Sequence, residues 1–289
     1  ILGSNTTISR NNITNSGGYG IYMLHGNANI LAYNEVIDNA YPGIFLDDSN
    51  GNTLVYNKIT GNDDAIYFLG SSDNSLSVNN LSGNRESGIV MIYSNRNSLT
   101  DNEIKENLGY GVIHGHGSEN RIYRNSIINN RFAGIHYSSG TLGNIYENSI
   151  LYNGGGGIYL SGRGSNNTIS RNNLITNGET GLYILGDSDY TIINANNISN
   201  HAKYGVLVED SEFNLFYGNT LGDNTLENAK EISPGINYWD FSGQGNCWDD
   251  FKRNRGFPDK YIIPGPGDGV DHFPTCGPFL GTKTGIKIP

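Results

Sequence analysis

The sequence has little of what long helices and membrane spans are built from. Charged residues make up 16% of the 289 residues, and there are only two methionines and eight prolines. Runs of leucine or alanine are scarce, while asparagine, glycine, serine and threonine abound, which argues against long helices. No apolar run approaches the roughly 18 residues that a membrane-spanning helix needs. The composition therefore favours short elements joined by turns, with no membrane span.

Positive charge is also scarce. The chain has 18 lysines and arginines against 28 aspartates and glutamates, a net charge of −10. Since no basic stripe is present to neutralise phosphates, the balance argues against nucleic acid as a partner. It equally disfavours a polyanionic glycan, unless a local basic patch overrides it.

Only two cysteines are present, Cys247 and Cys276, and both lie near the C-terminus. An even pair in a loop-rich segment predicts one disulfide and an oxidising compartment. The chain starts at Ile1 rather than at a methionine and shows no signal peptide, so we expect a processed or excised form. The expected location is extracellular or at the cell surface.

What the sequence has in abundance is repetition. Shifted by about 23 residues, it matches itself as a unit that starts N-x-[ILV]-x-x-N and continues with G-[IVL]. The first asparagine column is Asn11, Asn34, Asn57, Asn79, Asn102, Asn125, Asn148, Asn172, Asn196 and Asn219. The second is Asn39, Asn62, Asn84, Asn107, Asn130, Asn153, Asn177 and Asn224, with His201 in one place. A glycine column is Gly20, Gly43, Gly88, Gly111, Gly134, Gly157, Gly181 and Gly205, with Ala65 in one place.

Each unit holds three short runs in which apolar residues alternate with period two, which predicts three strands and three corners. The repeat therefore predicts an all-β protein, a parallel β-helix of about ten coils of 22–24 residues over residues 1–228. Coils stacked ~4.8 Å apart would align the asparagines into ladders at the corners. Residues 229–289 are expected to form a cap rich in Trp, Gly and Pro, pinned by the disulfide.

Two stretches, "NKITGN…AIYFLGSSDNSL" and "NSIINN…GIHYSSG", resemble the repeats of NosD-like and other carbohydrate-binding and sugar-hydrolase (CASH) domains. The resemblance extends over about residues 1–225 and implies a right-handed parallel β-helix. The tail "INYWDFSGQGNCWDDF" resembles the segment that follows such repeats in archaeal and bacterial cell-surface proteins. Those relatives often carry a calcium-type acidic run in this segment, where the present chain has "FKRNRGFPD". No metal or cofactor is predicted.

Two histidines stand close together in "GYGVIHGHGSEN" and raise the question of a metal site. His114 falls in an inward, otherwise apolar column, and no carboxylate or third imidazole falls beside His116 on adjacent coils. We therefore predict that His114 is a core residue and not a ligand.

The column two residues after the glycines is predicted to face outward and is rich in aromatic rings. Its aromatic members are Tyr22, Phe45, Tyr67, His136, Tyr159 and Tyr183. An apolar strip of this kind on a soluble rod is expected to be covered by another group. The tail, a second subunit or stacked sugar rings are the three alternatives.

One polar cluster is predicted at the corner just before the glycine column. It contains Asp63, Asp64, Arg85, Glu86, Tyr110 and Arg131 on neighbouring coils. Carboxylates about 5 Å apart suit a retaining glycosidase, and one beside Arg and Tyr suits a lyase or epimerase. The alternative is a solvated corner that holds weak ion pairs.

The C-terminal segment "GTKTGIKIP" alternates like a strand, with Ile286 and Ile288 on one face. We expect this tail strand to complete the N-terminal edge of the next molecule, so that the chain assembles head-to-tail with itself. Asn12, Asn80 and Asn197 lie in sequons and are candidate glycan carriers. The sequence thus favours a structural, self-assembling and non-enzymatic protein. The alternative is a carbohydrate-active enzyme (hydrolase, lyase or epimerase) or a glycan-binding module that acts on a cell-surface polysaccharide.

Overall fold

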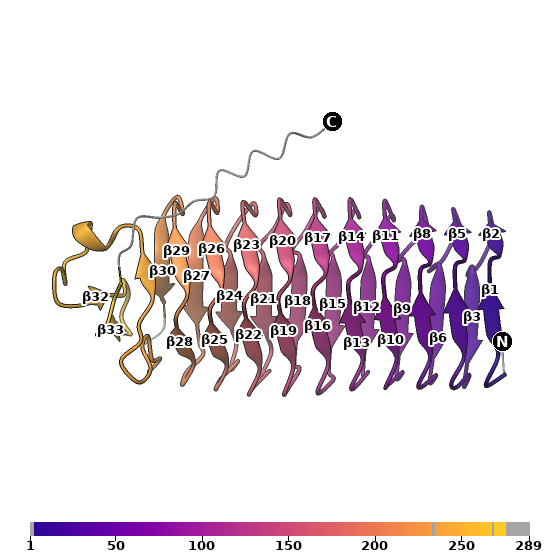
Figure 1. Ribbon diagram of the computed structural model, residues 1–289, viewed down its shortest axis with the longest axis horizontal. Coiled ribbons are helices and arrows are strands. Elements are labelled where there is room, and N and C mark those ends of the chain that lie inside the picture. Colours follow the sequence, from indigo (N-terminus) through magenta and orange to yellow (C-terminus); the bar gives the residue numbers. More distant parts are fainter. Residues whose placement is uncertain (1–2, 233–234, 268, 276–289) are drawn as a thin grey trace.

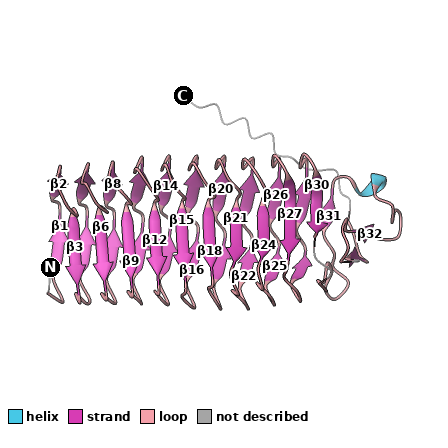
Figure 2. Cartoon of the chain, turned by 180° about the vertical axis from the view of Figure 1, so that it is seen from behind, coloured by secondary structure: helices cyan, strands magenta, loops and turns pink. Residues whose placement is uncertain are grey.

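The computed structural model describes residues 3–232, 235–267 and 269–275. These residues form a straight rod of stacked coils with a small cap at the C-terminal end (Figure 1). Each coil contributes one strand to each of three parallel sheets, and the corners between the strands line up along the rod (Figure 2). The described residues contain no helix that is long and apolar enough to span a membrane.

The three sheets have ten, eleven and ten strands. The first contains β1 (Thr7–Ser9), β4 (Ile30–Ala32), β7 (Thr53–Val55), β10 (Ser75–Ser77), β13 (Ser98–Thr100), β16 (Arg121–Tyr123), β19 (Asn144–Tyr146), β22 (Thr168–Ser170), β25 (Ile192–Asn194) and β28 (Leu215–Tyr217). The second contains β2 (Asn12–Thr14), β5 (Glu35–Ile37), β8 (Lys58–Thr60), β11 (Asn80–Ser82), β14 (Glu103–Lys105), β17 (Ser126–Ile128), β20 (Ser149–Leu151), β23 (Asn173–Ile175), β26 (Asn197–Ser199), β29 (Thr220–Gly222) and β31 (Cys247–Trp248). The third contains β3 (Ile21–Leu24), β6 (Ile44–Asp47), β9 (Ile66–Leu69), β12 (Ile89–Ile92), β15 (Val112–Gly115), β18 (Ile135–Ser138), β21 (Ile158–Ser161), β24 (Leu182–Leu185), β27 (Tyr204–Glu209) and β30 (Glu227–Glu231).

Coils stack residue on residue, as the repeat predicts. In the first sheet Leu76 of β10 pairs with Leu54 on one side and Leu99 on the other. Each of these leucines is fully buried, and so are most inward residues of the other two sheets, while Ile13 in the first coil is only partly buried. Because each strand buries every second residue, columns of aliphatic side chains fill the rod and hold adjacent coils in register.

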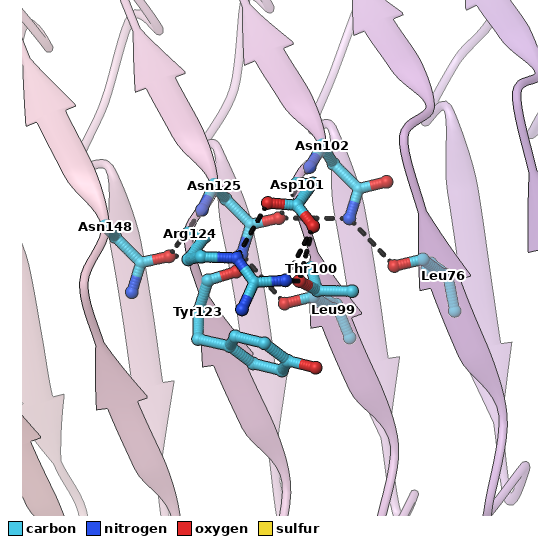
Figure 3. A network of polar contacts seen from close by, with 9 residues as sticks. All are labelled: Leu76, Leu99, Thr100, Asp101, Asn102, Tyr123, Arg124, Asn125 and Asn148. Atoms are coloured by element: carbon cyan, nitrogen blue, oxygen red, sulfur yellow. Dashed lines mark hydrogen bonds and ion pairs between the residues drawn. The ribbon is translucent and has the colours of Figure 1, made fainter.

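Asparagine ladders satisfy the buried backbone groups at the corners, as predicted. The Nδ2 of Asn102 donates to Asn125 Oδ1 in the next coil at 3.0 Å and to the carbonyl oxygen of Leu76 in the previous coil at 3.0 Å. Asn125 repeats this pattern toward Asn148 and Leu99 (Figure 3). Each amide therefore links three coils, which stabilises polar groups that would be costly to bury alone.

A third asparagine ladder, which the sequence analysis did not single out, leads into the first sheet. It consists of Asn29, Asn52, Asn74, Asn97 and Asn120, continues at Asn167, and ends with Asn214 and Asn237. Gly143 takes the place between Asn120 and Asn167, and its backbone N–H still donates to Asn167 Oδ1 at 2.8 Å. All three corners of the coil are thus built around buried amides.

The described part of the cap closes the C-terminal end of the core with stacked aromatic rings. Trp239 stacks on Phe216 with ring centroids 4.1 Å apart, and Trp248 stacks on Tyr261 at 4.0 Å. The buried carboxylate of Asp271 accepts the indole N–H of Trp248 at 2.9 Å. A short 3-10 helix, η1 (Phe251–Arg253), and the antiparallel strands β32 (Tyr261–Ile262) and β33 (Val270–Asp271) complete it.

Candidate functional site

The outward face of the third sheet carries the predicted aromatic column. Parallel pairing places Tyr22 beside Phe45 and Phe45 beside Tyr67. The complete column, one residue per coil, is Tyr22, Phe45, Tyr67, Val90, Ile113, His136, Tyr159, Tyr183, Leu207 and Lys230. Its rings fall into two groups separated by the aliphatic pair of β12 and β15.

The first group, which we call the N-terminal patch, consists of Tyr19, Tyr22, Tyr41, Phe45 and Tyr67. Tyr19 stacks on Tyr22 with centroids 5.1 Å apart and also lies 5.1 Å from Phe45. Phe45 in turn lies 5.1 Å from Tyr67. Tyr19 and Tyr41 come from the corner before the third sheet and are 37% and 53% exposed. The five rings form one continuous surface that is open to solvent.

The second group, the C-terminal patch, consists of Tyr110, Phe132, His136, Tyr159 and Tyr183. Tyr110 lies 5.2 Å from Phe132 and 5.5 Å from His136. Edge-to-face contacts at 6.4 and 5.5 Å then link His136 to Tyr159 and Tyr159 to Tyr183. Tyr110, placed in the polar cluster by the sequence analysis, is therefore part of the aromatic surface.

The carboxylates of Asp63, Asp64 and Glu86 gather at the corner beside the N-terminal patch. The backbone N–H of Glu86 donates to the carbonyl oxygen of Asp63 at 2.8 Å, so these two residues stack on adjacent coils. The N–H of Ser87 donates to Asp64 Oδ1 at 2.8 Å. Asp64 lies just before β9, the strand that presents Tyr67, and burial and the charge of Asp64 both raise the pKa of that phenol. The predicted acidic cluster thus borders the aromatic surface.

Burial raises the pKa of Asp64 to about 6, and the negative charges of Asp63 and Glu86 add to this effect. The hydrogen bond from the N–H of Ser87 acts in the opposite direction, because it stabilises the ionised carboxylate. A carboxyl group with this pKa populates both protonation states near neutral pH. Such a group can donate or accept a proton in a reaction.

The side chains of the two arginines predicted for the cluster contact other groups. Arg85 Nη2 donates to the carbonyl oxygens of Asn39 at 2.7 Å and Ala40 at 3.1 Å, two coils away. The coil between them has one residue fewer at this corner, so the Arg85 side chain reaches across that coil. Arg131 lies over the ring of Phe132, 5.6 Å from its centroid. In the described residues neither arginine forms an ion pair with the acidic cluster.

Further carboxylates along the face accept hydrogen bonds from its tyrosines. Tyr22 Oη donates to Asp47 Oδ2 at 2.9 Å, and Tyr159 Oη donates to Glu179 Oε2 at 2.6 Å. Tyr183 donates to Glu209 in the same way. The pKa of each of the three phenols is raised, in Tyr22 chiefly by the hydrogen bond and in the other two chiefly by burial. Carboxylates therefore line both edges of the aromatic column.

The described part of the tail does not cover this face. Residues 235–267 and 269–275 pack at the C-terminal end of the rod (Figures 1 and 2). The tail, a second subunit and a sugar chain therefore all stay predictions as the cover for the length of the sheet. The tail strand with Ile286 and Ile288 lies outside the described residues.

The two adjacent histidines point in different directions, which answers the question of a metal site. His114 is fully buried, stacks on Tyr137 with centroids 3.9 Å apart, and binds Asn120 Nδ2 at 2.9 Å through Nε2. Because Gly143 interrupts the ladder, His114 supplies the acceptor that Asn120 would otherwise lack. His116 turns outward at a corner and stacks on Tyr93.

Two other predictions, the disulfide and the glycan carriers, concern individual residues. Cys247 is a free thiol in the described residues, and Cys276 lies outside them, so the disulfide stays a prediction. Thr275, the residue before Cys276, pairs with Cys247. The sequon residues lie on the outward face of the second sheet, where Asn12 is exposed. Asn80 and Asn197 are half-buried, and their side-chain amides donate to Glu103 and Asn173.

The sequence pattern of the family described as right-handed β-helix region matches residues 1–150, more than half of the chain. The chain belongs to the right-handed β-helix family. A second family, described as periplasmic copper-binding protein (NosD), matches residues 133–253 of this β-helix protein. No curated protein matches the sequence.

Solved structures similar to this β-helix protein include epimerases and a tailspike protein. The periplasmic alginate epimerase AlgG has a TM-score of 0.69 at 16% identity, with 75% of this chain and 60% of the epimerase covered. The Dettilon tailspike protein has 0.61 at 12%, with 85% and 61% covered. A mannuronan C-5 epimerase A-module from Azotobacter vinelandii has 0.53 at 16%, with 81% and 64% covered. At these identities the likeness shows the fold alone, and the chain spans about three fifths of the length of these proteins.

The donor groups of this β-helix protein do not fit a copper site. Within residues 3–232, 235–267 and 269–275 no group of three or more His, Cys, Asp or Glu side chains has the arrangement to hold a metal ion. The two methionines, Met23 and Met91, are fully buried in the core. No step of the proposed chemistry uses a metal.

Proposed function

We propose that this β-helix protein binds a polysaccharide lengthwise along the outward face of its third sheet. The observation that carries the proposal is the line of aromatic rings in the N-terminal and C-terminal patches, left open by the described cap. Aromatic faces pack on the apolar C–H faces of sugar rings, and hydroxyl groups of the chain find acceptors in the carboxylates at both edges. A long, straight, partly exposed strip of this kind suits an extended polymer.

The comparisons support this interpretation at the level of the fold. Two of the similar structures are named as epimerases of alginate or mannuronan, which are polysaccharides. Those names describe the relatives and supply a precedent for polysaccharide chemistry on this scaffold, not a substrate for this chain. A polysaccharide partner is consistent with the predicted extracellular or cell-surface location.

A second candidate function is acid–base catalysis on the bound chain, and Asp64 is the specific observation that favours it. Its pKa of about 6 gives a group that can hold a proton near neutral pH, with the carboxyl group of Glu86 on the next coil. In hydrolysis Asp64 would protonate the leaving oxygen, while a water molecule adds to the sugar carbon and loses its proton to Glu86. In elimination Asp64 would take up a ring proton as the neighbouring C–O bond breaks and its oxygen leaves with a proton from water. In epimerisation it would take up the ring proton, and a proton from water would return to the opposite face. We assign Asp64 as the catalytic residue in this case.

Binding is tested with a panel of oligosaccharides and titration calorimetry. Phe45→Ala and Tyr159→Ala each remove one ring from the face, and we expect affinity to fall about tenfold or more in each. The matched control is Tyr123→Ala, because Tyr123 lies in β16 of the first sheet and stacks on Tyr146 of the next coil at 4.8 Å. Equal losses in all three variants, or no glycan bound by the unaltered protein, would reject the proposal.

Catalysis is tested on the glycans that bind. The products to measure are new reducing ends, unsaturated ends and altered sugar configuration. Asp64→Asn should abolish any turnover while binding persists, because an amide side chain can neither give up nor take up a proton near neutral pH. Turnover that survives this substitution would remove Asp64 from the mechanism, and absence of turnover in the unaltered protein leaves a pure binding face.

A further inference from the structure

We propose that the N-terminal patch selects a glycan that carries amino groups, not one that carries carboxylates; this inference rests on the binding function proposed above. The partner would be a chain rich in free amino sugars, with ammonium groups at neutral pH. The reasons lie in the charges that surround the patch and in the absence of a counter-charge within the described residues.

Carboxylates border the patch on both sides. Asp47 ends the strand that presents Phe45, and it is held in place by the hydroxyl of Tyr22 at 2.9 Å. Asp63 and Asp64 precede the strand that presents Tyr67, and Glu86 follows on the next coil. A sugar ring seated on Phe45 or Tyr67 would therefore meet carboxylates at either edge.

No cation of the described residues neutralises these groups. None of the ion pairs within 4.0 Å in that part of the chain contains Asp47, Asp63, Asp64 or Glu86. Arg85, the nearest guanidinium in sequence, is bound to backbone carbonyl oxygens. The four carboxylates therefore form no ion pair within 4.0 Å among the described residues, and the patch has an acidic border.

At some other corners of the same rod an arginine one coil later pairs with an exposed carboxylate. Asp101 accepts from Arg124 at 2.8 Å (Figure 3), and Asp73 accepts from Arg96 in the same way at 2.8 Å. At the C-terminal patch, Lys203 lies 3.1 Å from Glu179. The carboxylates at the N-terminal patch have no such partner among the described residues.

This arrangement has opposite consequences for the two kinds of charged glycan. A uronic acid polymer would bring like charges together at the rings, which costs binding energy and slows encounter. An ammonium group would form charge-assisted hydrogen bonds with the carboxylates, which are stronger than neutral ones. We infer that the patch prefers a cationic glycan, opposite in charge to alginate, the polymer after which one structurally similar epimerase is named.

The test compares three oligosaccharides of equal length with different charge. These are a β-1,4-linked glucosamine oligomer, its N-acetylated neutral counterpart and a mannuronate oligomer, each titrated at low and high salt. We expect the glucosamine oligomer to bind about tenfold more tightly than the neutral one, and high salt to reduce that difference. Equal or tighter binding of the neutral or anionic oligomer would overturn this inference and leave the proposed function intact. Binding of none of the three would contradict both.

Substitutions locate the effect. Asp63→Asn combined with Glu86→Gln should remove the preference for the glucosamine oligomer over the neutral oligomer. Asp101→Asn is the matched control, since it removes a paired carboxylate from another corner. If the preference persists in the double variant, or is lost equally in the control, the patch is not its source. The salt dependence of the unaltered protein tests the same point without any variant.

Discussion

The Nδ1 atom of His201 accepts the backbone N–H of Asn177 at 3.2 Å, at a ladder position where the other coils have asparagine. Its Nε2 atom lies 3.0 Å from the carbonyl oxygen of Leu174 in the previous coil. A neutral imidazole protonated at Nε2 thus supplies one acceptor and one donor in the places of an asparagine Oδ1 and Nδ2. The ladder tolerates this exchange only while the ring is uncharged.

The first prediction concerns acid stability. Burial lowers the pKa of both His201 and His114 to about 4, whereas an unfolded histidine titrates near 6.5. Protons therefore bind the unfolded chain first, and the stability from each neutral ring is lost as the pH falls from 6.5 to about 4. This amounts to about 3 kcal/mol per ring. Thermal melts followed by circular dichroism at pH 7, 6 and 5 should show a falling melting temperature.

His201→Asn separates this effect from other titrations. Asparagine restores the ladder without an ionisable ring, so we expect equal or higher stability at pH 7 and a shallower decline toward pH 5. The control is His116→Asn, because His116 is exposed at its corner. If both variants follow the pH dependence of the unaltered protein, the buried ring of His201 does not govern it.

The second prediction concerns the ladder itself. Asn125→Ala removes the acceptor for the backbone N–H of Asn102 and the donor to the carbonyl oxygen of Leu99, and leaves these buried groups unpaired. Each unsatisfied group costs about 1–3 kcal/mol, so the denaturation midpoint should fall clearly. Asn12→Ala, at an exposed position of β2, should leave the midpoint unchanged. Similar midpoints for the two variants would mean that the ladders contribute little to stability.

The repeat predicts the fold well because coils of nearly equal length stack in register, so one column assignment places every residue. It places Phe45 and Tyr67 on one face without any structure. It cannot give the direction of Arg85, whose long side chain binds carbonyl oxygens of the two preceding coils. Tyr19 was missed because the aromatic column was defined two residues after the glycines, whereas Tyr19 directly precedes Gly20. Asn29 and the rest of the third ladder were visible in the sequence as N-x-[IL] and were not recognised as buried.

The third prediction concerns self-assembly. The sequence predicts that residues 281–289 of one molecule complete the sheet edge of another, and strand addition of this kind produces head-to-tail filaments. Negative-stain electron microscopy of the full chain should then show filaments that disappear when these residues are deleted. Monodisperse rods in both samples would contradict the assembly model. The binding face of the third sheet does not depend on that outcome.

The fourth prediction concerns the glycine column, where coils approach most closely. A Cβ placed on Gly88 would lie 2.4 Å from Ile104 Cγ2 and 2.7 Å from the carbonyl oxygen of Gly111. One of these contacts is with the backbone of the next coil, which cannot move without breaking the stack. Gly88→Ala should therefore destabilise the protein by roughly 1–3 kcal/mol or more, as overpacked cores do.

Ala65 provides the matched comparison, because it occupies the same column and is fully buried. Its coil has one residue fewer at the preceding corner, and its methyl group is accommodated there. Ala65→Gly removes that methyl group and frees the unfolded backbone, so we expect a loss of about 1 kcal/mol or somewhat more. Urea denaturation followed by tryptophan fluorescence and circular dichroism measures both variants. If Gly88→Ala is neutral, the coil can expand locally, and the glycine column does not set the spacing of the stack.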